Sequence, residues 1–108
     1  MINEKLLNDL NHIFINYKEI ERVLLFGSRA RNDNKDYSDV DICLFGKDIT
    51  HLVYAKIVMD IEEINTPLSF DVVNFNELSK EKFIENIVTE GIEIYNGKET
   101  RWKKKWFL

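Results

Sequence analysis

The chain has 108 residues, with 19 acidic and 15 basic side chains and a formal net charge of −4. This length supports one apolar core, so we expect a single domain over residues 1–108. The acidic balance argues against general nucleic-acid binding, which depends on neutralising phosphates. The apolar runs are too short to span a membrane, the N-terminus lacks the pattern of a secretory signal, and the only cysteine, Cys43, suits a reducing setting. We therefore expect a cytoplasmic location.

The first half of the chain predicts one helix and two strands. Apolar residues recur at helical spacing over 2–17, which indicates an amphipathic helix. RVLLFG (22–27) is typical of a buried strand, and SDVDICLF (38–45) alternates between apolar and polar positions like a second strand. Because a parallel crossover needs a dozen or more residues, the short connection between the strands predicts antiparallel neighbours, with a turn of helix after Gly27.

The second half alternates between helical and strand patterns. The expected elements are a helix over about 50–64, a strand over 68–75, a helix capped by Asn76 or Ser79 and stopped by Gly91, and a strand over 91–97. The apolar stripe expected on the first of these helices is Leu52, Val53, Ile57, Ile61 and Ile64. The order predicts an α/β (α+β) fold, with a small mixed β-sheet flanked by helices.

Two carboxylates stand close together at the start of the second strand. Alternation puts Asp39 and Asp41 on one face of that strand, roughly 6.5 Å apart along it. Carboxylates at this spacing repel each other unless a cation lies between them, and Mg²⁺ commonly binds through one or two carboxylates together with substrate phosphates. Taken alone, an Asp-Val-Asp tripeptide is also compatible with a solvated strand edge.

A phosphate-binding turn precedes these acids. Gly27 ends the first strand, where a residue without a side chain lets the backbone approach a phosphate closely. Ser28 supplies a hydroxyl and a free amide at the start of a helical turn. Arg29 and Arg31 add cationic donors for phosphate oxygens. The combination of this turn with the paired acids predicts a site for a metal–nucleotide complex.

A third acid, Asp71, lies within LSFDVVNF (68–75). If this strand lies beside SDVDICLF, Asp71 joins Asp39 and Asp41 in a three-carboxylate site for two metal ions. Such a site holds the attacking and leaving oxygens during displacement at phosphorus. Asp71 is then also placed to help deprotonate the attacking hydroxyl. The alternative is a strand whose polar face is simply exposed.

The stretch LFGSRARNDNKDYSDVDICLF, followed by FDVVNF, resembles the minimal nucleotidyltransferases (MNT) of the DNA polymerase β-like superfamily. The signature of that family is Gly-Ser, ten residues, Asp-x-Asp and a later aspartate on a strand. The resemblance covers roughly residues 20–96 and implies the polymerase β-like fold. It implies Mg²⁺-dependent transfer of a nucleoside monophosphate from ATP or another NTP, with two metal ions. It places Gly27 and Ser28 on the triphosphate, and Asp39, Asp41 and Asp71 on the metal.

The chain departs from the family pattern at Asn32, where many members carry glycine after Arg-Ala-Arg. Asparagine tolerates a left-handed backbone better than most residues do, so we expect the turn to persist.

The family resemblance also bears on the acceptor of the nucleotide. Because larger relatives carry a further acceptor domain, we expect this one to need a second subunit or a partner. Small members are often encoded beside a helical HEPN protein, which implies the antitoxin or transferase subunit of a HEPN–MNT pair that adds AMP to its toxin partner. The alternatives are an antitoxin that acts by occlusion alone and a small-molecule adenylyltransferase that works as a homodimer.

The C-terminal residues 98–108 are basic and aromatic, ending in RWKKKWFL. Trp102, Trp106 and Phe107 could pack back onto the domain. Tryptophan beside cationic residues is also typical of protein interfaces. Nucleic-acid binding is the third, least favoured interpretation.

Overall fold

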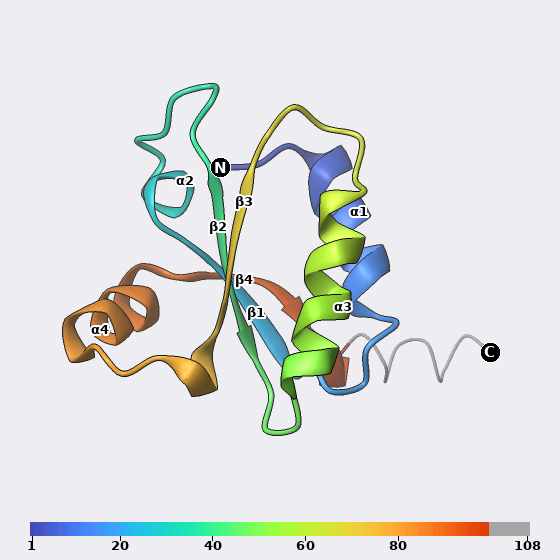
Figure 1. Ribbon diagram of the computed structural model, residues 1–108. Helices are drawn as coiled ribbons and strands as arrows, with labels where there is room; N and C mark the ends of the chain where they lie inside the picture. The colour runs from blue at the N-terminus through green and yellow to red at the C-terminus, as the bar shows by residue number, and fades with distance from the viewer. Residues whose placement is uncertain (100–108) are drawn as a thin grey trace.

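The computed structural model describes residues 1–99, which form a four-stranded sheet with helices on both faces (Figure 1). The elements follow the predicted order. They are α1 (Glu4–Phe14), β1 (Arg22–Phe26), α2 (Ser28–Arg31), β2 (Val40–Phe45), α3 (His51–Glu62), β3 (Phe70–Asn74), the 3₁₀ turn η1 (Phe75–Glu77), α4 (Glu81–Glu90) and β4 (Ile92–Asn96).

The sheet is mixed, with the strand order β3-β2-β1-β4. Strand β1 pairs antiparallel with both β2 and β4, whereas β2 and β3 run parallel. The antiparallel pairing of β1 with β2 and the helical turn after Gly27 confirm the predictions from the short connection. The parallel pair β2–β3 is joined by α3, a crossover of the length that parallel strands require.

Apolar side chains pack in two layers, one on each face of the sheet. Helices α1 and α3 cover one face and α4 covers the other (Figure 1). The larger layer contains Leu10, Phe14, Ile42, Ile57 and Ile61, and the smaller contains Leu24, Phe26, Cys43 and Ile87. Residues Val40, Ile42 and Leu44 belong to the larger layer and Cys43 to the smaller, so the predicted alternation along β2 is confirmed. Burial raises the pKa of the Cys43 thiol to about 12, in keeping with a structural role.

Several local predictions were wrong. Leu52 is 66% exposed, because α3 carries apolar residues beyond the face that it buries. Neither Asn76 nor Ser79 caps α4: Lys80 occupies the cap position without a side-chain hydrogen bond, and the side chain of Asn74 instead caps η1. Gly91 does end α4, where its amide donates to the carbonyl of Ile87.

The tail over residues 100–108 lies outside the described residues, so the predictions for RWKKKWFL remain predictions. Within residues 1–99, no helix combines the length and apolarity that a membrane crossing needs.

Candidate active site

The parallel pairing of β2 and β3 brings the predicted acids together. Asp41 and Asp71 are register partners across the two strands, and Asp39 stands just before β2. Since the neighbours of Asp41 on β2 point into the layer beneath α1 and α3, the Asp41 side chain faces the opposite side of the sheet. The condition on which Asp71 joins the other two acids, that its strand lies beside SDVDICLF, is therefore met.

The electrostatics of Asp41 show how close these groups lie. Burial is the largest cause that raises the pKa of this half-buried carboxyl, and the charges of Asp71 and Asp39 raise it further. The cationic side chains of Arg31 and Arg29 act in the opposite direction. Asp39 and Asp71 themselves are exposed. The site is thus a group of carboxylates that repel one another.

The donor chemistry of these three acids fits a hard divalent cation such as Mg²⁺, which prefers carboxylate oxygens. Among residues 1–99, no three acidic, histidine or cysteine side chains are already gathered around a metal position. Two properties of the acids therefore suit a divalent cation: their carboxylate oxygens are the preferred ligands, and a cation would relieve the repulsion that raises the pKa of Asp41.

Gly27 brings the end of β1 against the acids. Its backbone has φ 73° and ψ −155°, a conformation that residues with a side chain rarely adopt. A Cβ atom at this position would lie 2.3 Å from Oδ2 of Asp41. The Gly27 carbonyl accepts hydrogen bonds from the amides of Ala30 and Arg31, which fold the following residues into α2. Glycine is therefore required both by the backbone and by the neighbouring carboxylate.

Helix α2 places Ser28 at its start and Arg31 at its end. Ser28 is half-buried beside Gly27, whereas Arg31 is exposed. The Arg31 guanidinium lies 3.1 Å from the Asp33 carboxylate and 3.5 Å from that of Glu90 at the end of α4. The helix ends at Asn32, whose backbone is left-handed with φ 62°. Asparagine therefore adopts the conformation that was expected of it at this position, where many family members carry glycine.

Arg29 occupies a different environment from the one predicted. It is 6% exposed, and its guanidinium donates to the backbone carbonyls of Ser38, Asp36 and Met1 at 2.8–3.2 Å. These bonds tie the N-terminus and the segment before β2 to α2. The phosphate contact predicted for Arg29 has no support in this geometry, and its side chain instead holds the loop that carries Asp39.

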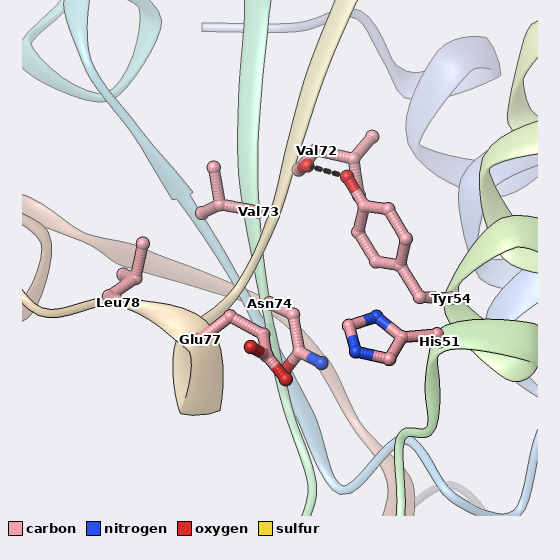
Figure 2. A pocket seen from close by; sticks show the side chains of 7 residues that line it. All are labelled: His51, Tyr54, Val72, Val73, Asn74, Glu77 and Leu78. Atoms are coloured by element: carbon pink, nitrogen blue, oxygen red, sulfur yellow. Dashed lines mark hydrogen bonds between the residues drawn. The ribbon is translucent and has the colours of Figure 1, made fainter.

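One side chain beside the acids was missed by the sequence analysis. Tyr54 of α3 donates its hydroxyl to the carbonyl of Val72, the residue after Asp71 (Figure 2). Burial, followed by the charge of Asp71, raises the pKa of Tyr54. No motif marks this tyrosine, because the contact arises only when α3 packs against β3. Tyr54 also lines a pocket of about 330 Å³, here called the β3-edge pocket, with His51, Val72, Val73, Asn74, Glu77 and Leu78.

Residues 8–100 match the family described as "Polymerase beta, Nucleotidyltransferase", so the chain belongs to this family and is a transferase enzyme.

Sequence and structure comparisons agree with this assignment. A putative protein adenylyltransferase, MJ0141 of Methanocaldococcus jannaschii, is 29% identical over 80 residues, which cover 70% of this chain and 80% of the relative. A toxin–antitoxin crystallised with AMP-PNP is similar in structure with a TM-score of 0.68 and 17% identity, over 98% of this chain and 90% of that one. A putative nucleotidyltransferase from Sulfolobus solfataricus is similar in structure with a TM-score of 0.58 and 24% identity, over 87% of this chain and 80% of that one. At these identities the two structures establish the fold alone.

Proposed function

We propose that the chain is a Mg²⁺-dependent adenylyltransferase that moves AMP from ATP to a hydroxyl of a partner protein. The observation that carries this proposal is the register of Asp41 with Asp71, combined with the packing of Gly27 against Asp41. One relative is named a putative protein adenylyltransferase, and one structural neighbour is a toxin–antitoxin crystallised with AMP-PNP. These names support AMP as the transferred group and a protein as its acceptor.

Each residue has a separate task in this scheme. Asp39, Asp41 and Asp71 would hold the metal, which supplies charge neutralisation at the phosphates and orients the reacting oxygens. Gly27 leaves room for the triphosphate beside the backbone, and Ser28 offers it a hydroxyl. Arg31, which is exposed and carries a full positive charge, is the cationic side chain placed to reach a phosphate.

The chemical step is a displacement at the α-phosphorus of ATP. A bond forms between the acceptor oxygen and phosphorus, the bond from phosphorus to the bridging oxygen breaks, and pyrophosphate leaves. The acceptor hydroxyl loses its proton to Asp71, which lies on the outer strand of the acid group and is exposed.

The partner that we propose is a helical HEPN-type protein, with this chain as the antitoxin. The fold that this chain shares with a crystal structure of the toxin–antitoxin MntA–HepT supports this choice. The TM-score is 0.65 and the identity 16%, over 91% of this chain and 76% of that one.

The test is the intact mass of the HEPN-type protein after co-expression with this chain. We expect one or more AMP-sized increments with the wild type and none with Asp39→Asn/Asp41→Asn. A matched control is Asp48→Asn/Glu85→Gln, which removes two exposed charges that are not among the groups that shift the pKa of Asp41 and should leave the increments intact. Equal neutralisation of the toxin by wild type and double variant, without any increment, would replace the proposal with an antitoxin that acts by occlusion.

A further inference from the structure

The third acid of the site stands on the least supported strand. Strand β2 is hydrogen-bonded on both sides, by β1 and β3, which fixes Asp41. Strand β3 lies at the edge of the sheet and has only β2 as a strand neighbour within residues 1–99. The position of Asp71 relative to Asp41 therefore also depends on what contacts the outer side of β3.

Tyr54 occupies that outer side. The amide of Val40 donates to the carbonyl of Ser69, so the backbone groups of residues 69, 71 and 73 face β2. The groups of residues 70, 72 and 74 consequently face away from β2. The Val72 carbonyl is one of these outward acceptors, and it takes its hydrogen bond from the Tyr54 hydroxyl (Figure 2).

The surroundings of this hydrogen bond are loosely filled. The β3-edge pocket contains both Tyr54 and Val72 in its lining. A second pocket of about 160 Å³ also contains both residues, and its lining includes Asp71, Phe70 and residues of α3. Tyr54 therefore lies between two pockets, and its hydroxyl forms a hydrogen-bonded link from α3 to the residue after Asp71.

We infer that Tyr54 is a positioning residue, whose hydroxyl anchors the outer edge of β3 and so keeps Asp71 opposite Asp41. This role rests on the proposed function, because it matters for catalysis only if the acids hold a metal. Repulsion among the acids pushes β3 outward, and the bond to the Val72 carbonyl opposes that movement. The neutral phenol at this position is a donor, which a backbone carbonyl requires.

The experiment compares Tyr54→Phe with Tyr17→Phe. Tyr17 donates its hydroxyl to Asp60, which lies on the same helix α3 but away from β3. Both variants keep an aromatic ring and lose one hydroxyl donor. The lost hydrogen bond is exposed in Tyr17→Phe and part-buried in Tyr54→Phe. The probe is Mn²⁺ alone, titrated calorimetrically, and the second readout is amide hydrogen exchange at Asp71 and Val73.

We expect Tyr54→Phe to bind Mn²⁺ about tenfold more weakly, the lower end of the range for groups that orient metal ligands. We expect the amides of Asp71 and Val73 to exchange faster than in the wild type, and Tyr17→Phe to change neither readout at β3. Unchanged exchange at β3 in Tyr54→Phe would overturn the inference, as would wild-type Mn²⁺ affinity. If the wild type itself binds no Mn²⁺, the proposed function fails, and the exchange readout still decides the positioning role.

Discussion

Replacing Gly27 with alanine tests the geometry that joins β1 to the acids. An L-residue at φ 73° and ψ −155° costs about 1–3 kcal/mol of backbone strain. Alanine recovers about 0.4–1 kcal/mol of this by restricting the unfolded chain. The new Cβ would also lie 2.3 Å from Oδ2 of Asp41, so that side chain must turn away, at about 0.5–1.5 kcal/mol. We expect Gly27→Ala to lower the free energy of unfolding by about 2 kcal/mol.

The assay is urea denaturation of four proteins: the wild type, Gly27→Ala, Asp41→Ala and the double variant. Removing the Asp41 carboxylate abolishes the contact but leaves the backbone strain, so Gly27→Ala should cost about 1 kcal/mol less in the Asp41→Ala background. An identical cost in both backgrounds would refute the contact between position 27 and the carboxylate. A negligible cost in the wild-type background would refute the backbone geometry as well.

Two further predictions concern charged side chains. Arg29→Ala should lower the free energy of unfolding by about 3 kcal/mol, because it removes charged donors from backbone carbonyls. Arg31 is exposed, so Arg31→Ala should change the stability little. Equal losses of stability in urea denaturation would contradict the structural role of Arg29. Burial and the charges of Asp71 and Asp39 raise the pKa of Asp41, so its ionisation opposes folding above that raised pKa and the penalty disappears as the pH falls through it. In the presence of a chelator, Asp41→Asn should therefore be more stable than the wild type at pH 7 in urea denaturation, and this gain should be lost as the pH falls through the raised pKa of Asp41. The exposed Asp48→Asn is the matched control, and a gain that persists at low pH would contradict the electrostatic cause.

The order of elements and the antiparallel pairing of β1 with β2 could be predicted because they depend on local patterns. The short connection between β1 and β2 has too few residues for a parallel crossover, and α3 supplies the crossover that lets β3 join β2 in parallel. The exposure of Leu52 could not be predicted, because α3 is apolar around much of its circumference and its sequence does not mark the buried face. The buried residues of α3 are Ile57 and Ile61, which belong to the larger apolar layer.

The two arginines of the turn show the corresponding limit for the site. Arg29 and Arg31 are the same residue type, two positions apart, and both were predicted to contact phosphate. Two residues in a helical turn point in nearly opposite directions, about 200° apart, so one faces the loop before β2 while the other faces solvent. Which arginine faces which side depends on how α2 packs, and the sequence pattern does not contain that information.

The position of each acid within the sheet also bears on how a cation would be accepted. Asp39 and Asp41 lie two residues apart in one segment, and Asp41 is held in β2, which is paired on both sides. Asp71 is the acid whose strand lies at the sheet edge, so mutual repulsion acts chiefly on β3. A cation between the strands would remove that repulsion and draw β3 toward β2, while Tyr54 limits its outward movement beforehand. Metal binding should therefore protect β3 from hydrogen exchange more than β1 or β4, and this difference should be largest in Tyr54→Phe, where the hydrogen bond to the Val72 carbonyl is lost.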